Sequence, residues 1–328
     1  ALYGTTIGHD YPVDDAVYTT GNRFVQRGLA GVPDILTRGS MAGVDNTEVG
    51  LYRPLVLLNF LVEIGLWGNS PHVHHLINVL LYALTASLLF LLLRRMLHDR
   101  PPELAFVVAL LFVFHPVHTE VVASIKSRDE ILAWLFGVLG FLQLFEHSRT
   151  RSYRPLVLAT VLFLLAMFCK EGSAAFVLVA PLMLYFFTRD DIAAITRAAM
   201  PPGAALVTYL AVRTAVMKAV LFNQPLASYN NALVAANTFA DRLATRFAIL
   251  GKYLWLMVYP RDLTWDYSYR HVSIVSWDDW RPLLTLVVYL AILFVAVTGL
   301  RRRNEVAFGI LFYLITLAPA SNFLFLIG

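Results

Sequence analysis

The stretch Val73–Leu93, VHHLINVLLYALTASLLFLLL, is a continuous apolar run in the first third of the chain. A transmembrane helix needs about 20 mostly apolar residues to cross about 30 Å of hydrocarbon. A membrane β-barrel would show short alternating segments instead of a continuous run. Because backbone polar groups in lipid must be hydrogen-bonded within the segment, this stretch predicts a membrane-spanning α-helix.

The composition of the whole chain agrees with this stretch. Of the 328 residues, 58% are hydrophobic and only 15% are charged, and the mean hydropathy is +0.64. A soluble domain could not bury that much apolar surface and still cover itself with charge. We therefore predict an all-α, polytopic helical bundle that forms a single membrane domain, residues 1–328. Further spans are expected at Glu103–Phe114, Ile131–Phe145, Pro155–Phe168, Ala174–Phe187, Gly203–Val220, Leu283–Leu300 and Val306–Ala318.

Basic clusters predict the orientation of these spans, because arginine and lysine gather at cytoplasmic ends. The clusters follow the first, third and fifth spans and separate the last two: Arg94, Arg95 and Arg100; Arg149, Arg151 and Arg154; Arg189 and Arg197; Arg301, Arg302 and Arg303. The opposite side would then hold a long polar first loop, residues 8–54, and an extracytoplasmic or interfacial segment, residues 217–280. A loop of such length is usually functional.

The segment Leu243–Tyr259 complicates this topology. It is apolar and helical in pattern, but it contains Arg246 and Lys252. If it crossed the membrane, the basic cluster that begins at Arg301 would move to the outer side. We therefore expect this segment to lie in the membrane interface or to re-enter from the outer side.

The ends of the chain suggest a piece of a longer protein. The chain opens on Ala1 without a methionine, so a first span and a C-terminal part are expected to be missing. Its one cysteine, Cys169, leaves no possibility of an internal disulfide.

Two adjacent carboxylates, Asp14 and Asp15, lie early in the first loop. Two neighbouring carboxylates repel each other, so the pKa of one should rise unless a cation or hydroxyl partners it. One interpretation is a general base that takes a proton from an acceptor hydroxyl. The other is a solvated acidic turn after Pro12, and the residues alone leave both open.

His115, His118 and Glu120 gather at the end of an expected span. Their side chains could ligate a metal. However, Pro116 breaks the helix that would align the two histidines, and a fourth ligand is not evident. Hydrogen bonding at a span end is the interpretation that we prefer, so no metal site is predicted, although a divalent metal stays open as an alternative.

Several cations are expected at the same outer face, among them Lys126, Arg128, Lys170 and Arg213. Arginine binds phosphate through a bidentate fork and lysine as a point charge. The alternative is that these side chains snorkel to lipid headgroups. Lys170 stands apart, because Glu171 follows it and the two would form a buried ion pair in the membrane.

A series of short motifs then suggests a family. The motifs are Asp14-Asp15 with Asn22, Tyr52-Arg53-Pro54-Leu55, His75-Leu-Ile-Asn78, His115-Pro-Val-His-Thr-Glu120, Arg128-Asp-Glu-Ile-Leu132, Cys169-Lys-Glu171, Asp266-Tyr-Ser268 and Pro319-Ala-Ser-Asn322. In this order, over nearly the whole chain, they resemble the transmembrane O-mannosyltransferases that carry tetratricopeptide repeats, and their bacterial relatives in the GT-C superfamily.

This resemblance implies a polytopic helical enzyme with a lipid-phosphate sugar donor and an active site at the outer or lumenal membrane face. It implies that Asp14-Asp15 lies at the catalytic centre, with Arg53 and Asn322 among the supporting residues. Two departures concern the acceptor and the donor phosphate. The chain contains no repeat domain, and the Glu-Arg-aromatic motif of the family does not follow Asn322 within it.

The hypothesis at this stage is a membrane glycosyltransferase that moves a mannose-like sugar from a polyprenyl-phosphate donor to an acceptor hydroxyl. Asp14 or Asp15 would be the base, and Arg128, Lys170 and Arg213 would hold the donor phosphate or the acidic pair. No cofactor is expected, and the sequence contains no Gly-rich phosphate loop. The expected partners are membrane lipid, an acceptor protein or glycan, and possible partner subunits. Binding of nucleic acid is not expected. A bacterial inner membrane suits the chain, or the endoplasmic reticulum in a eukaryote. The rival is a non-catalytic membrane scaffold, a transporter-like subunit or an inactive relative.

Overall fold

The computed structural model describes residues 2–45, 50–218, 231–261, 263–264, 272–324 and 326. These residues form helices and connecting turns, with no strand in the described ranges, so the predicted all-α fold is confirmed. Within the expected single membrane domain there are two compact units. The first comprises Ala1–Leu184 with Thr188–Gln224, and the second Tyr185–Phe187 with Pro225–Gly328.

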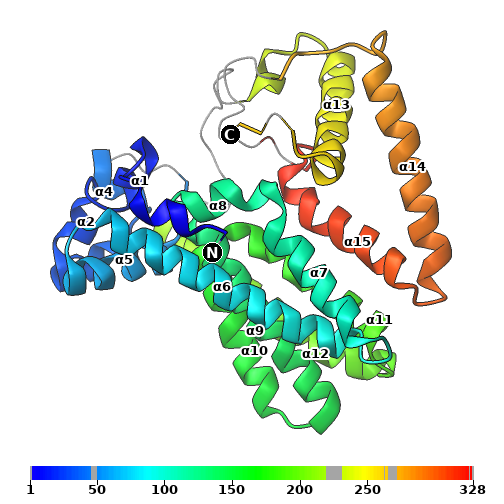
Figure 1. Ribbon diagram of the computed structural model, residues 1–328, viewed down its shortest axis with the longest axis horizontal. Helices are drawn as coiled ribbons and strands as arrows, with labels where there is room; N and C mark the ends of the chain where they lie inside the picture. The colour runs from blue at the N-terminus through cyan, green and yellow to red at the C-terminus, as the bar shows by residue number, and fades with distance from the viewer. Residues whose placement is uncertain are drawn as a thin grey trace. The chain divides into compact units, whose positions relative to one another are not determined.

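Four long helices form the bundle of the first unit: α6 (Pro71–Met96), α9 (Arg128–Thr150), α10 (Arg154–Cys169) and α12 (Ile192–Met217). Helix α9 is the central element, packing against α6 and α10, and α10 packs in turn against α12 (Figure 1). A glycine allows this close approach. A Cβ atom at Gly140 would come within 2.9 Å of the ring of Phe163 on α10.

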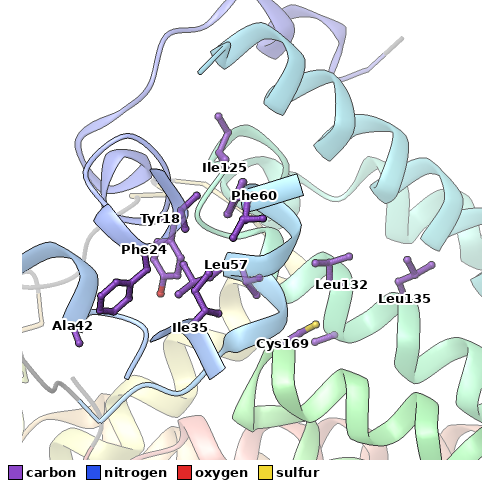
Figure 2. Close-up of a cluster of buried hydrophobic side chains, with 14 residues drawn as sticks. Tyr18, Phe24, Ile35, Ala42, Leu57, Phe60, Ile125, Leu132, Leu135 and Cys169 are labelled. Carbon is purple, nitrogen blue, oxygen red and sulfur yellow. The ribbon is translucent and has the colours of Figure 1, made fainter. Parts of the chain in front are cut away.

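The predicted first loop is folded. It contains the short helices α1 (Val13–Tyr18), α2 (Arg23–Gln26), α3 (Val32–Thr37) and α4 (Ala42–Asp45), with a 3-10 turn at Gly28–Gly31, and another 3-10 turn, Gly4–Gly8, leads into it. It is followed by α5 (Pro54–Trp67), a helix that we did not predict. Phe24, Ile35 and Phe60 are buried in one apolar cluster that joins these helices to α9 (Figure 2). The loop is therefore a small folded layer with its own share of the core.

A break separates α7 (Pro102–Phe114) from the short elements that follow it. The 3-10 turn Pro116–His118 and α8 (Thr119–Ala123) continue the chain after a bend of 50°. Proline cannot continue a helix here because it lacks a backbone donor and crowds the preceding turn. The predicted helix break at Pro116 is confirmed.

The second unit is built on α13 (Phe239–Val258), α14 (Trp280–Leu300) and α15 (Glu305–Leu317), with 3-10 turns at Ala232–Ala235 and Ala318–Ala320. Helix α14 packs against both α13 and α15. A cavity of about 470 Å³ lies beside α13 and α14, with Trp255 and Trp280 among its lining residues. Helix α11 (Phe176–Phe187) begins in the first unit and ends in the second.

Within the described ranges, three helices are long and apolar enough to cross a membrane, namely α6, α9 and α14. The bent pair formed by α7 and α8 is a fourth if it is one broken span. The other expected spans correspond to α10, α11 and α15, which are shorter apolar helices, and to α12. Helix α13 is not among the candidate spans in the described part of the chain, and the interfacial or re-entrant position of Leu243–Tyr259 stays a prediction.

Candidate active site

The two carboxylates of the acidic pair have different environments. Asp15 is fully buried, and its carboxylate accepts three hydrogen bonds from the turn between α8 and α9. Ser124 Oγ and the Lys126 backbone N–H donate to Oδ1 at 3.1 and 2.8 Å, and the Ile125 N–H donates to Oδ2 at 3.0 Å. Asp15 thus fixes the first loop to this turn, and its oxygens have little capacity left for a substrate.

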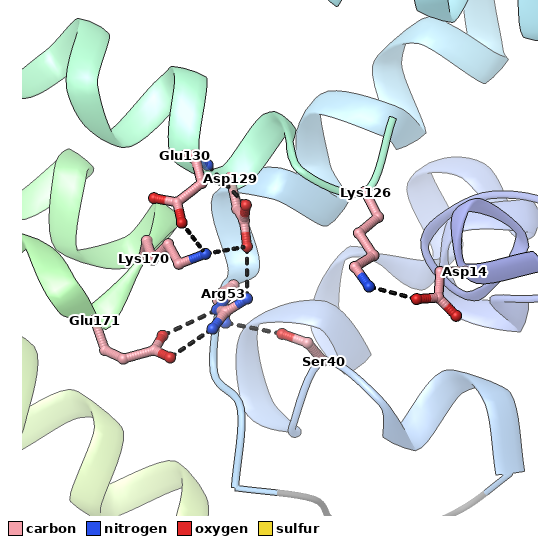
Figure 3. Close-up of polar contacts among 8 residues, drawn as sticks. All are labelled: Asp14, Ser40, Arg53, Lys126, Asp129, Glu130, Lys170 and Glu171. Atoms are coloured by element: carbon pink, nitrogen blue, oxygen red, sulfur yellow. Dashed lines mark hydrogen bonds and ion pairs between the residues drawn. The ribbon is translucent and has the colours of Figure 1, made fainter. Parts of the chain in front are cut away.

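Asp14 keeps an accessible carboxylate. Its side chain is 46% exposed, and it forms an ion pair with the ammonium group of Lys126, which is 38% exposed (Figure 3). The cation expected beside the acidic pair was Arg128, Lys170 or Arg213, whereas the structure places Lys126 there. Lys126 therefore contacts both aspartates, Asp15 through its backbone and Asp14 through its side chain.

A second group of charges connects the first loop to α9 and α10. Arg53, just before α5, forms a bidentate pair with Glu171, with Nε–Oε2 at 2.9 Å and Nη2–Oε1 at 2.5 Å. Its Nη1 also contacts Asp129 Oδ2 at 2.5 Å. Lys170 Nζ lies 2.5 Å from Glu130 Oε1 and 3.5 Å from Asp129 (Figure 3). We call Arg53, Asp129, Glu130, Lys170 and Glu171 the ion network.

The expected pairing of Lys170 with Glu171 is corrected by this geometry. Lys170 has a fully extended backbone, with φ −152° and ψ 129°. Successive side chains of an extended segment point to opposite sides, so the two neighbours reach different partners. Lys170 contacts the start of α9, and Glu171 contacts Arg53.

The charges of the ion network stabilise each other's ionised forms. Burial alone would raise the pKa of Glu171, but the hydrogen bonds and charge of Arg53 outweigh it and hold that pKa below its usual range. Burial likewise tends to lower the pKa of Lys170, and Asp129 and Glu130 more than compensate, so that pKa is raised. The ion network therefore favours the ionised forms of Glu171 and Lys170.

Arg128 has a different setting from the one expected. Its side chain is fully buried at the start of α9, where it donates to Asn78 and Asn59 at 2.6 and 2.8 Å and to Glu63 at 2.5 Å. It also donates to the His74 carbonyl at 2.7 Å. These contacts hold α9 to α5 and α6. Because the guanidinium group is used in this structural role, we do not assign it to binding of a donor phosphate.

The remaining predicted residues are distributed over both units. Arg213, on α12, donates to the Gly50 carbonyl of the first loop at 2.9 Å. His115 accepts from the Val117 N–H at 3.2 Å. The ring of His118 lies 4.3 Å from that of Phe112, and Glu120 is exposed on α8. Asn322 lies in the second unit, where its Oδ1 accepts from Asn231 at 2.7 Å.

The histidine motif therefore makes hydrogen bonds and ring contacts at a helix break, as preferred from the sequence. Throughout the described ranges, no group of three or more His, Cys, Asp or Glu side chains has the geometry of a metal site. Asp129 and Glu130 were not among the predicted site residues. An available signal was their place just before the expected span Ile131–Phe145, where carboxylates are favoured at a helix start; the structure places them in the first turn of α9.

Comparison with known proteins identifies the chain's relatives. It is 28% identical over 368 residues to human protein O-mannosyl-transferase TMTC1, a match that covers 99% of this chain and 41% of that protein. It is 33% identical over 177 residues to Drosophila melanogaster Tmtc1, covering 52% of this chain and 20% of that protein. The chain is related to the protein O-mannosyl-transferases. Human TMTC2 is 28% identical over 269 residues, with 76% of this chain and 32% of that protein covered.

These relatives confirm the resemblance inferred from the motifs. The chain spans less than half of the length of these O-mannosyl-transferases. No protein-family model and no solved structure matches the chain. Together with the apolar helices, the relationship makes this an integral membrane protein.

Proposed function

We propose that this chain is the membrane part of a GT-C-type enzyme that transfers a mannose-like sugar from a polyprenyl-phosphate donor to an acceptor hydroxyl at the extracytoplasmic face. The observation that carries the proposal is that the two aspartates of the acidic pair differ in exposure and contacts. Asp15 anchors the first loop, and Asp14 presents an accessible carboxylate beside Lys126. Three of the relatives are named as protein O-mannosyl-transferases of human or fly, which supports the class of reaction.

In this reaction Asp14 acts as the general base. The acceptor hydroxyl oxygen attacks the anomeric carbon of the sugar, the bond from that carbon to the donor phosphate oxygen breaks, and the hydroxyl proton passes to Asp14. The lipid phosphate leaves with the bonding electron pair. The positive charges of Lys126 and Lys170 favour departure of the phosphate.

The direction in which the site faces is part of the proposal. Helices α6 and α9 run parallel, because Arg128 at the start of α9 contacts His74 and Asn78 near the start of α6. Near their other ends, Arg95 of α6 donates to the Leu142 carbonyl of α9. The acidic pair thus belongs to the end of these helices opposite to their basic clusters, and a helix of 26 residues like α6 is about 39 Å long. If the basic ends are cytoplasmic, Asp14 faces the extracytoplasmic side.

The test is sugar transfer by the purified chain with Asp14→Asn. Asparagine keeps the shape of the side chain and removes the proton acceptor, so the rate should fall by about 10²–10⁴-fold. The donor is a short-chain polyprenyl-phosphate mannose, the acceptor a serine- and threonine-containing peptide, and release of the lipid phosphate is followed. Asp34→Asn is the matched control, because Asp34 is a carboxylate of the same loop in a surface ion pair with Arg27 at 2.8 Å. Full activity of Asp14→Asn would end the proposal, and a wild-type chain without transfer would favour the scaffold.

A further inference from the structure

Helix α13 carries two arginines one turn apart, Arg242 and Arg246, which have no carboxylate partner among the described residues. The nearest acidic neighbour in sequence, Asp241, instead accepts from Thr238 at the start of the helix. The Nε–H groups of both arginines are buried and have no hydrogen-bond acceptor in the part of the chain that the structure describes. Buried donors are almost always paired in proteins, so two orphan guanidinium donors side by side indicate an acceptor that binds from outside the chain.

The surroundings of the two arginines converge from three segments of the second unit. Arg242 Nη2 lies 3.4 Å from the Ala236 carbonyl at the end of the 3-10 turn Ala232–Ala235. The Arg246 guanidinium lies 5.5 Å from the centre of the Phe323 ring, and Phe323 packs against Phe247. These contacts remove water from the arginines and supply no negative charge.

The arrangement is unfavourable without a ligand. Residues four apart on a helix are neighbours, at about 5–6 Å between Cβ atoms, so the two like charges repel each other. Burial, and then the charge of Arg242, lower the pKa of Arg246 below its usual range. A single anion with several oxygen atoms would accept from both forks and remove the repulsion. Phosphate has this geometry, and arginine binds it through paired N–H groups.

We propose that Arg242 and Arg246 bind the phosphate group of a membrane lipid. The lipid tail is indicated by apolar side chains exposed in the same unit. Phe239, one turn before Arg242, is 71% exposed, and α13 packs against α14, which is a candidate span. A ligand for this surface therefore combines an anionic head with an apolar tail. The inference does not depend on the proposed sugar transfer, because the phosphate can belong to a polyprenyl phosphate or to a bilayer phospholipid.

The experiment measures lipid binding by the intact chain in detergent, both as ligand-bound fraction in native mass spectrometry and as ligand-induced rise in melting temperature. The probes are farnesyl phosphate, phosphatidylglycerol, farnesol and inorganic phosphate. The double variant Arg242→Gln, Arg246→Gln removes both charges. It should bind whichever lipid phosphate the wild type binds, farnesyl phosphate or phosphatidylglycerol, about 100-fold or more weakly, because each charge-assisted contact contributes about tenfold to affinity. The control is Arg301→Gln, Arg302→Gln, which removes two exposed arginines of the same unit.

The outcomes separate the sources of the phosphate. Binding of farnesyl phosphate but not phosphatidylglycerol identifies a polyprenyl phosphate as the ligand. Binding of phosphatidylglycerol but not farnesyl phosphate identifies a bilayer phospholipid. Either outcome supports the proposal if the control variant binds as wild type does. Equal binding of farnesol, equal binding of inorganic phosphate, or undiminished binding by the double glutamine variant overturns it. Folding of the double variant is checked by its melting temperature without ligand. Because the repulsion between Arg242 and Arg246 is removed, this temperature should be equal to that of the wild type or higher. If that variant does not fold, Arg246→Lys is used, which keeps the charge and removes the Nε donor and should bind more weakly than wild type.

Discussion

Replacement of Asp15 by asparagine should destabilise the protein, although the change is nearly isosteric. The carboxylate is fully buried and accepts from two backbone N–H groups and one hydroxyl. Asparagine has one carbonyl oxygen and one NH₂ group. If the oxygen takes the place of Oδ1, it still accepts from Ser124 and Lys126. The NH₂ group then faces the Ile125 N–H, so two donors meet without an acceptor.

The size of this effect follows from the three contacts. Hydrogen bonds to a charged group contribute about 1.5–3 kcal/mol, and a buried donor left unpaired costs about 1–3 kcal/mol. Asp15→Asn loses the charge on all three bonds and strands the Ile125 N–H, so we expect a loss of about 2–4 kcal/mol. Asp14→Asn breaks only the half-exposed pair with Lys126, and exposed pairs contribute about 0–1 kcal/mol.

The assay compares the two variants and Asp34→Asn by thermal unfolding in detergent, together with sugar transfer. Asp15→Asn should melt several degrees below wild type, and below its melting point it should keep part of the activity because Asp14 is still present. Asp14→Asn should melt like wild type and transfer sugar 10²–10⁴-fold more slowly. If Asp15→Asn is as stable as wild type and loses all transfer, Asp15 is the base, and our assignment of the two roles is wrong.

Three further predictions concern the ion network and the topology. Arg53→Met should cost about 3 kcal/mol in the free energy of unfolding, because it strands buried carboxylates, and Glu171→Gln should recover part of that loss in the double variant. Because the folded-state pKa of Glu171 is depressed, the stability that ionised Glu171 contributes is fully present above its unfolded pKa, about 4.3, and is lost as the pH falls through its folded pKa. Glu171→Gln should therefore weaken the decrease in unfolding free energy at acidic pH. An unchanged decrease contradicts this prediction. Single cysteines at positions 34 and 149, in a chain whose buried Cys169 is replaced by alanine, should be labelled by an impermeant maleimide from opposite sides of the membrane, and labelling from one side refutes the orientation.

The long helices could be predicted from the sequence because lipid-length apolar runs leave few alternatives. The Val73–Leu93 run corresponds to α6, and the Leu283–Leu300 run to α14. The folding of the first loop could not be predicted in the same way. Its helices are four to six residues long, too short for a periodic pattern, and they are stabilised by burial of Phe24 and Ile35 rather than by local preference.

The sequence indicated most of the charged residues that lie near Asp14 and Asp15, but not which of them form ion pairs with each other. The sequence pointed to Asp14 and Asp15 together, but which carboxylate is buried depends on a turn more than a hundred residues away. Adjacency in sequence suggested a Lys170–Glu171 pair, whereas the extended backbone at Lys170 separates the two side chains. Nothing local to Lys126 distinguished it from a cation that snorkels to lipid.

The position of Asp14 depends on three separate attachments of the first loop to the bundle. Asp15 binds the turn before α9, Arg53 binds the start of α9 and Glu171, and Arg213 of α12 binds the Gly50 carbonyl. Each attachment joins residues far apart in sequence, so none forms unless the bundle and the folded loop are both in place. A general base must lie within hydrogen-bond reach of the proton that it removes, and displacement by about 1 Å is costly. Changes at Arg53 or Arg213 should therefore lower the turnover rate by moving Asp14, without contact with the reacting atoms, and the loss should be partial where removal of Asp14 itself is severe.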